Sequence, residues 1–265
     1  MTTSPAVLAL GASVDLLPRM AVAVSGGVDS LTLMAFAHAR RGTDSVRAVH
    51  AVSPAVPPAS TARVQQLAAE RGWHLTLIDA GETEDPAYLD NPVDRCRVCK
   101  THLYDAMAAL VAHSSADVVI VSGTNTDDLD DFRPGLAAAR AHGVRHPFIE
   151  AGLRKDDVRA LARSLALGAH AELPAQPCLS SRVETGTRID AAMLRMIDEI
   201  ESAARAVLGA SATVRCRVRA HGMVLELDEH VLLGLDDTAR AQLLALAPHA
   251  ALAPYRMGSA FLRVL

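Results

Sequence analysis

The stretch Ala21–Arg40 reads AVAVSGGVDSLTLMAFAHAR and decides the fold of the first part of the chain. Its apolar start predicts a strand, the SGGVDS segment predicts a tight turn, and the remainder predicts a helix. A strand that enters a helix through such a turn directs backbone N–H groups and the positive end of the helix dipole at one point. Gly26 and Gly27 let the backbone approach an anion closely, and Ser25 and Ser30 add hydroxyl donors. The stretch predicts a phosphate site, with a plain glycine turn as the alternative.

Apolar runs alternate with helical patterns through the first half of the chain. The runs are MAVAVS (20–25), VRAVHAV (46–52), HLTLIDA (74–80) and DVVIVSG (117–123). This alternation predicts an α/β fold with a parallel sheet that is covered by helices on both faces. The three prolines of SPAVPPAS (53–60) predict the loop after the second strand.

The pattern changes near residue 186. Apolar residues at three- and four-residue steps predict one long helix over 189–208. Paired strands are then expected in TVRCRVRAHG and MVLELDE, a helix in DDTARAQLLALA and a last strand in AFLRVL. We therefore expect two domains: 1–186, which contains the phosphate loop, and 187–265, a small α+β domain for substrate binding or oligomerisation.

Composition limits the class of protein. The chain has 265 residues, half of them apolar, which is enough for a large core. A net charge of −4 gives no general attraction to nucleic acid or to anionic membranes. No apolar run is long enough to span a bilayer and the N-terminus lacks a signal-peptide pattern, so we expect a cytoplasmic protein. Four cysteines in a reducing compartment favour metal or redox chemistry over a disulfide framework.

Two of the cysteines form a CxxC pair, Cys96 and Cys99, just before the helix predicted in THLYDAMAALVAH. This spacing can bring both sulfurs to one metal, and Arg95, Arg97 and Lys100 would help to keep the thiolates ionised. On spacing alone, a redox pair, half a zinc site and two ordinary small residues remain alternatives. The sequence holds no second CxxC that would complete a four-cysteine zinc site.

The segment PCLSSR (177–182) contains a third candidate cysteine, Cys178. Arg182 in the same segment could hold a substrate phosphate in a fork geometry that lysine cannot match, beside the hydroxyls of Ser180 and Ser181. Cys216 lies in the predicted strand VRCRVR, and we expect it to be a buried filler, which is common for a cysteine outside a site.

An acidic loop, SGTNTDDLDDFRPG (122–135), follows the fourth predicted strand at the sheet edge where parallel sheets place their ligands. Its carboxylates are hard oxygen ligands of the kind that bind Mg²⁺. For any single aspartate, a turn or a helix cap is the alternative. The candidates are Asp127, Asp128, Asp130 and Asp131. Arg133 and Lys155 could contact phosphate, although a charged residue at a helix start is more often solvated.

Alternation in RCRVRAHG places Arg215, Arg217 and Arg219 on the same face of a strand. Such a concentration of positive charge is hard to explain as solubility in an acidic protein, with ordinary surface charge as the alternative. Glu226 and Asp228 on the next strand could meet substrate or a cation.

The SGGVDS segment is neither a GxxxxGK[ST] loop nor a GxGxxG loop. It resembles the pyrophosphate loop of the PP-loop ATP pyrophosphatases, which cleave ATP to AMP and pyrophosphate and adenylate an oxygen of their substrate. The resemblance implies that phosphates are held by Ser25, Gly26, Gly27, Asp29 and Ser30.

Further segments resemble the LarE family, in the same order, over nearly the whole chain. They are NPVDRCRVCK, GTNTDDLDDFRPGL, VRHPFIEAGLRKDDVRALARSLAL, PCLSSR, RVRAHG and YRMGS. Members of that family are ATP-dependent sulfur transferases of the PP-loop superfamily that make the nickel-pincer nucleotide of lactate racemase. The resemblance implies that a carboxylate of pyridinium-3,5-biscarboxylic acid mononucleotide is adenylated and converted to a thiocarboxylate.

The resemblance also implies a way of supplying sulfur. One branch of the family sacrifices the sulfur of a cysteine that matches Cys178. In the other branch, cysteines that match Cys96, Cys99 and Cys178 hold a 4Fe-4S cluster whose fourth iron binds external sulfide. The chain has all three cysteines and so resembles the second branch.

Binding residues and partners follow from the same resemblance. ATP and Mg²⁺ would be bound with the help of Thr124, Asn125, Asp127 and Asp128. The nucleotide substrate would be bound by Ser180, Ser181, Arg182, Arg217 and Arg219. The implied partners are proteins of nickel insertion or of the lactate racemase pathway, a second copy of the chain in a homo-oligomer, and neither a membrane nor nucleic acid.

The chain departs from the family pattern on the substrate side. An aromatic residue and a lysine are expected before PCLSSR, where this sequence reads AHAELPAQ, and residues 224–254 follow the family only loosely. Three alternatives therefore stay open: thiolation of another acceptor such as tRNA, a sacrificial cysteine, and a nucleotide-binding iron–sulfur sensor that is not an enzyme. The net negative charge argues against tRNA.

Overall fold

The computed structural model describes residues 4–112, 117–130, 133–209 and 211–261, which form two compact units. The first lies within Met1–Glu82 and Cys96–Gln176, and the second within Thr83–Arg95 and Pro177–Leu265. The second unit therefore begins at Pro177 and also includes residues 83–95 from the first half of the chain. The sequence predicted a single boundary at residue 186. No helix in these described ranges is long and apolar enough to cross a membrane.

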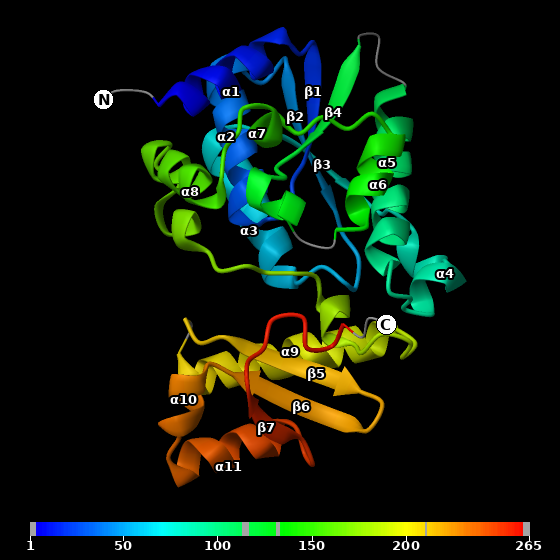
Figure 1. The fold of residues 1–265 in the computed structure, drawn as a ribbon, viewed down its shortest axis with the longest axis vertical. Coiled ribbons are helices and arrows are strands. Elements are labelled where there is room, and N and C mark those ends of the chain that lie inside the picture. The colour runs from blue at the N-terminus through cyan, green and yellow to red at the C-terminus, as the bar shows by residue number, and fades with distance from the viewer. Residues whose placement is uncertain (1–3, 113–116, 131–132, 210, 262–265) are drawn as a thin grey trace. The chain divides into compact units, whose positions relative to one another are not determined.

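The first unit is built on a four-stranded sheet with strand order β3-β2-β1-β4 (Figure 1). Its strands are β1 Arg19–Ala23, β2 Val46–Ala51, β3 His74–Ile78 and β4 Val118–Ser122. All three strand pairs are parallel and each strand coincides with a predicted apolar run, although β1 begins one residue before its run, so the expected α/β sheet is confirmed. Because β1 is a central strand, the SGGVDS turn that follows it lies in the middle of the carboxyl edge of the sheet.

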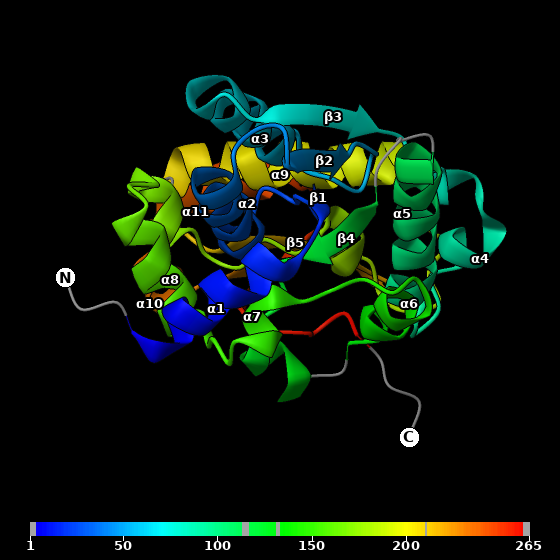
Figure 2. The same ribbon diagram turned by 90° about the horizontal axis from the view of Figure 1, so that it is seen from above.

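Seven helices and two short 3-10 helices surround this sheet in the described part of the first unit. They are α1 Pro5–Leu16, α2 Val28–Arg41, α3 Pro58–Arg71, α5 Arg95–Ala112, α6 Gly135–Ala141, α7 Pro147–Glu150, α8 Lys155–Ser164, η2 Thr126–Asp130 and η3 Gly168–Glu172. The helices α1 and α2 lie on one side of the sheet, and α5 and α6 lie on the other (Figures 1 and 2).

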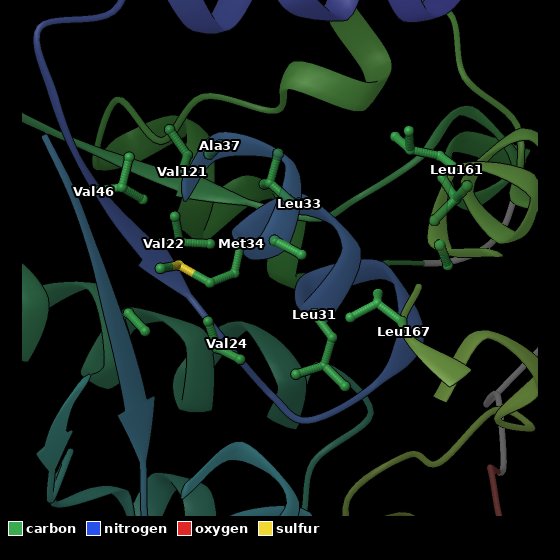
Figure 3. Close-up of a cluster of buried hydrophobic side chains, with 14 of the residues drawn as sticks. Val22, Val24, Leu31, Leu33, Met34, Ala37, Val46, Val121, Leu161 and Leu167 are labelled. Carbon is green, nitrogen blue, oxygen red and sulfur yellow. The ribbon is translucent and has the colours of Figure 1, made fainter. Parts of the chain in front are cut away.

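Two apolar clusters join these helices to the sheet. Alternation along β1 places Met20 and Val22 in one cluster and Ala21 in the other. The first cluster packs β1 against α2, with Leu31, Leu33 and Met34 fully buried (Figure 3). The second packs β1 and β4 against α5 through Leu103, Tyr104 and Met107. Burial on both faces fixes the strand from which the SGGVDS turn begins.

Two helices begin earlier than the sequence predicted. The helix α3 starts at Pro58, inside the expected 53–60 loop, because proline is well suited to the first turn of a helix. The helix α5 starts at Arg95, so Cys96 and Cys99 lie within its first turns and not before the helix. The two cysteines therefore take a defined helical spacing.

The second unit contains a three-stranded sheet of order β5-β6-β7. Its elements are β5 Val214–Arg219, β6 Gly222–Leu227, β7 Ala251–Pro254, α4 Pro86–Leu89, α9 Ala191–Leu208, α10 Glu229–Leu233, α11 Asp237–Leu246 and η4 Leu179–Arg182, and η1 Glu82–Glu84 crosses the division. Strands β5 and β6 pair, as predicted, and are antiparallel, and β7 is parallel to β6.

The long helix α9 confirms the predicted 189–208 pattern. Asp190 caps its start by accepting a hydrogen bond from the Met193 amide at 2.8 Å. Its buried face includes Leu194, Ile197 and Ile200 and packs on β5. The helix predicted in DDTARAQLLALA is confirmed as α11. Strand β7 was not predicted, because four residues that end in proline show no alternation; the strand expected in AFLRVL falls largely on residues 262–265, outside the described ranges.

Candidate active site

The SGGVDS turn joins β1 to α2 with the geometry of an anion-binding loop. Gly26 has a φ of +83°, and a Cβ placed there would lie 2.9 Å from the carbonyl oxygen of Ser60. Gly27 is the N-cap residue of α2 and lacks a capping side chain. The first amides of a helix without a capping side chain can bind a ligand. At Gly26, the positive φ and the nearby Ser60 carbonyl oxygen both require glycine.

The serine hydroxyls hold the loop together. The Ser25 amide donates to Ser30 Oγ at 3.1 Å, and Ser30 Oγ donates to the Gly27 carbonyl at 3.1 Å. The Ser25 and Ser30 hydroxyl oxygens lie 3.2 Å apart. In this arrangement Ser30 is a buried support of the loop, while Ser25 is exposed and can turn toward a ligand.

Asp29, in the first turn of α2, joins the loop to two other segments. Its carboxylate accepts hydrogen bonds from Lys155 Nζ at 2.5 Å and from Asn125 Nδ2 at 3.3 Å. Lys155, a candidate for phosphate contact, pairs with an aspartate that is distant in sequence, so the alternative of a merely solvated charge does not apply. The arrangement places an ion pair beside the predicted phosphate position.

The end of β4 approaches the loop closely. A Cβ placed on Gly123 would lie 2.8 Å from the Ser30 amide nitrogen, so only glycine allows this contact. Thr124 follows, and its hydroxyl lies 3.1 Å from Ser122 Oγ, which in turn contacts His146 Nδ1 at 2.8 Å. Desolvation lowers the pKa of His146. Sequence analysis assigned no role to Gly123 or His146, and the glycine after a strand was the available signal.

The aspartates of the acidic loop are engaged by cations and amides. Asp127 accepts from the Lys155 amide at 3.0 Å and from Arg154 Nε at 2.8 Å, and these bonds lower its pKa. Asp128 accepts from the Asn125 amide at 3.1 Å and pairs with Arg133 at 2.6 Å.

Each carboxylate oxygen of Asp127 and Asp128 thus has one partner and keeps a second lone pair, so the Mg²⁺ role of these aspartates stays a prediction. Asp130 is exposed, and Asp131 lies outside the described residues.

Cys96 and Cys99 are three residues apart in the first turns of α5, so they lie on one face of that helix. Both side chains are partly buried. A Cβ on Gly135 would lie 3.5 Å from the Cys96 carbonyl oxygen and 2.9 Å from Lys100 Cγ, which places the start of α6 against this turn. Two thiols on one helical face fit the predicted metal-binding role in number and spacing.

Cys178 belongs to the second unit, where it is the N-cap residue of η4. Its side chain is partly buried, and its carbonyl oxygen accepts hydrogen bonds from the Ser181 amide at 3.0 Å and from Arg182 Nη1 at 3.2 Å. Arg182 Nη1 also donates to the Pro177 carbonyl at 2.7 Å. The backbone around Cys178 is thus held from within its own loop.

The predicted fork of Arg182 is bound to a carboxylate in the structure. Its Nε and Nη2 donate to the two oxygens of Glu201 at 2.9 and 3.0 Å, and both side chains are almost fully buried, at 3% and 1% exposure. Burial raises the pKa of Glu201, but the Arg182 guanidinium and the Cys216 amide outweigh it and leave a lowered pKa. Arg182 therefore holds the loop of Cys178 to α9.

Arg217 and Arg219 share a second glutamate. Glu226 accepts from Arg217 Nε and from Arg219 Nη2, each at 2.9 Å, and from Ser259 Oγ at 2.5 Å. Arg217 is buried, whereas the side chain of Arg219 is 34% exposed. Among the described residues, the buried Nε of Arg219 has no hydrogen-bond partner.

The other residues of this region have structural contacts. Arg215 is mostly buried and lies over the ring of Tyr255, 5.7 Å from its centroid. Asp228 accepts a hydrogen bond from the Thr213 amide at 2.8 Å. Cys216 is fully buried, as predicted, and burial raises the pKa of its thiol to about 12.

A buried asparagine in the excursion 83–95 was missed by sequence analysis. Asn91 has a φ of +53° and donates its amide to the carbonyls of Glu184 at 2.8 Å and Thr187 at 3.0 Å. Tyr88 contacts the buried hydroxyl of Ser180 at 2.5 Å. Ser180 is thus buried with an internal partner, while Ser181 stays partly exposed. An asparagine before a proline indicated only a turn.

These features define an α/β protein with a glycine-rich candidate phosphate loop at the carboxyl edge of a parallel sheet. No model of a known protein family matches the sequence. The chain is 37% identical over 185 residues to the uncharacterized protein slr1717 of Synechocystis, covering 70% of this chain and 68% of that protein. The chain belongs to the family of that protein.

Two further relatives match shorter shares of their own length. Over 173 residues, 65% of this chain and 62% of the relative, the chain is 32% identical to pyridinium-3,5-bisthiocarboxylic acid mononucleotide synthase of Lactiplantibacillus plantarum. It is 31% identical over 127 residues to an uncharacterized protein of Methanocaldococcus jannaschii, covering 48% of this chain and 49% of the relative. The match to the synthase supports the resemblance to the LarE family.

Proposed function

We propose that the protein is an ATP-dependent sulfur transferase in the synthesis of pyridinium-3,5-bisthiocarboxylic acid mononucleotide. It would adenylate a carboxylate of pyridinium-3,5-biscarboxylic acid mononucleotide and convert it to a thiocarboxylate for the nickel-pincer cofactor. The observation that carries the proposal is the SGGVDS turn between β1 and α2, in a chain 32% identical to the Lactiplantibacillus synthase.

The proposed reaction has two substitution steps. A carboxylate oxygen of the substrate attacks the α-phosphorus of ATP, and the bond to pyrophosphate breaks. A sulfur nucleophile then attacks the acyl carbon, and AMP leaves with the electrons of the carbon–oxygen bond. The amides at the start of α2 are suited to stabilise the charge of the pyrophosphate. In this proposal Mg²⁺ arrives with ATP as part of the substrate.

The thiols of Cys96, Cys99 and Cys178 are the proposed ligands of a 4Fe-4S cluster. Thiolates are the ligands of such clusters, and three of them leave one iron open to an external sulfide, which is the chemistry the cluster would supply. The protein would present two thiolates on the first turns of α5. It would hold the third through the hydrogen bonds of Arg182 to the backbone at Cys178.

The phosphate of the mononucleotide is proposed to bind at Arg219. A buried guanidinium nitrogen without a partner is costly, so the unpaired Nε of Arg219 supports an anion there. Arg217 would support Arg219 by sharing Glu226. The bidentate pair with Glu201 gives Arg182 the role of a structural residue in this proposal.

The test is anaerobic analysis of iron and acid-labile sulfide, combined with pyrophosphate release from ATP. Wild type should hold about four iron atoms per chain. Each of Cys96→Ala, Cys99→Ala and Cys178→Ala should lose them. Cys216→Ala is the matched control, because this fourth cysteine is fully buried, and it should keep the iron. Pyrophosphate release should require the biscarboxylic mononucleotide.

Other outcomes would identify the alternatives. Iron-free protein whose Cys178 loses the mass of hydrogen sulfide during turnover would contradict the cluster and establish a sacrificial cysteine. Pyrophosphate release only with tRNA, with steep salt dependence, would identify another acceptor. ATP binding without pyrophosphate release with any acceptor would contradict the enzyme and favour a sensor.

A further inference from the structure

An arginine outside the SGGVDS turn also contacts it. Arg63, in the second turn of α3, donates from Nη1 to the Gly26 carbonyl at 2.7 Å and to Gln176 Oε1 at 3.1 Å. The same end of α3 supplies Ser60, whose carbonyl oxygen approaches Gly26 so closely that a Cβ would not fit. The first turns of α3 therefore form one wall of the loop.

The charge of Arg63 has no acidic partner in the described part of the chain. Its side chain is partly buried, and desolvation lowers the pKa of its guanidinium. By contrast, Lys155 on the other side of the loop is paired with Asp29 at 2.5 Å. A desolvated cation without a counter-ion is unfavourable, and a bound anion would relieve that cost.

The free donors of Arg63 suit such an anion. Within the described residues, Nη1 makes the hydrogen bonds of the guanidinium to the protein, which leaves Nε and Nη2 available. A guanidinium presents paired N–H groups that match two oxygens of a phosphate. Arg63 can thus fix the Gly26 carbonyl with one nitrogen and bind an anion with the others.

We infer that Arg63 is a further ligand-binding residue of this site and that it contacts the β- and γ-phosphates of ATP. The inference rests on the proposed use of ATP and adds a residue from α3 to the loop. It assigns the main cationic contact to Arg63, because Lys155 is neutralised by Asp29. The contact should be strong for ATP and pyrophosphate and absent for AMP, which lacks these phosphates.

The experiment is titration calorimetry of the full chain with ATP, inorganic pyrophosphate and AMP. Arg63→Ala should weaken ATP and pyrophosphate binding about ten- to a hundredfold, the usual effect of losing a charge-assisted hydrogen bond, and should leave AMP binding unchanged. Arg63→Gln keeps a side-chain donor near Gly26 but no charge, and should be weakened as well.

Arg71→Ala is the matched control, since Arg71 lies on the same helix, is partly buried and also donates to backbone carbonyls, those of Leu165 and Ala166. This variant should bind all three probes as wild type does. Equal pyrophosphate binding by wild type and Arg63→Ala, or full rescue by Arg63→Gln, would overturn the inference and leave the proposed function standing. Wild type that binds neither ATP nor pyrophosphate would contradict the proposed function itself.

Discussion

Arginines play opposite parts in the two units. In the first, Arg63 lies against the SGGVDS turn and has no acidic partner among the described residues. In the second, Arg182 and Arg217 are buried and each is paired with a glutamate, Glu201 or Glu226. The first arrangement leaves charge available for a ligand, whereas the second uses charge to connect a loop or strand to its neighbours.

The difference shows that burial of an arginine does not by itself indicate a binding site. A desolvated guanidinium needs a negative partner, which either the protein or a ligand can supply. Where a carboxylate is already in bidentate contact, as at Arg182, the arginine is structural. Where the carboxylate is missing, an anionic ligand is the natural partner.

The largest effect is expected from Glu201→Ala. This change leaves Arg182 buried without its counter-ion, so the free energy of unfolding should fall by about 3–5 kcal/mol in denaturant titrations. Glu199→Ala on the same helix is the control, because Glu199 is exposed and should change stability by less than about 0.5 kcal/mol. Equal stability of the two variants would contradict the structural role of the Arg182–Glu201 pair.

A smaller loss of stability with a specific loss of ligand is expected for Gly26→Ala. The positive φ should cost about 1–2 kcal/mol, and the contact with Ser60 should displace the loop and weaken ATP binding at least about tenfold. Gly152→Ala is the control, since its φ is +71° and nothing lies within 4 Å of the added Cβ. The control should share the backbone strain but bind ATP as wild type does. Equal ATP binding by both variants would show that the SGGVDS turn is not the ATP-binding site.

The smallest effect concerns pH. His50 is a buried residue of β2, and its Nδ1 contacts the carbonyl oxygen of Val24, just after β1, at 2.7 Å. Desolvation lowers the pKa of His50. As pH falls below about 6.5 the unfolded chain takes up the proton first. The contribution of His50 to the free energy of unfolding is complete above that pH. It is lost as pH falls through the lowered pKa of the folded state, by at most about 1.4 kcal/mol per pH unit.

Denaturant titrations between pH 7.5 and 5.5 measure this loss, and His50→Gln should make the decline shallower. If the free energy of unfolding fell with the same slope against pH in wild type and variant, the role of His50 would be contradicted. The second unit should respond at lower pH, because the lowered pKa of Glu201 keeps its ion pair intact until the medium is more acidic than the ordinary glutamate range.

Much of the first unit could be predicted from sequence. The four strands and the turn after β1 depend on local patterns of apolar residues and glycines, which act within a few residues of chain. The start of α5 was misplaced, because the CxxC motif was interpreted as a feature preceding a helix. Strand β7 was missed, because its four residues are stabilised by pairing with β6 and not by their own pattern.

The candidate site was predicted less completely. The SGGVDS residues and the three cysteines were visible as motifs, and Lys155 was a possible phosphate contact whose acidic partner was not predicted. Arg63 stood in no motif, and Asn91 of the second unit stood in NPVDRCRVCK without a role of its own. Their importance comes from hydrogen bonds to the Gly26 and Glu184 carbonyls, groups that every residue of the chain possesses and that no sequence pattern distinguishes.

The sequence by itself determined the parallel sheet, the glycine turn at its edge, the long helix with its hairpin, and the positions of the sulfur atoms along the chain. These features follow from short-range sterics and from apolar periodicity. Only the tertiary structure decided which charges are neutralised, since the acid that partners Lys155, Arg182 or Arg217 lies on another element. Ion pairing depends on distance in space, and folding alone sets that distance.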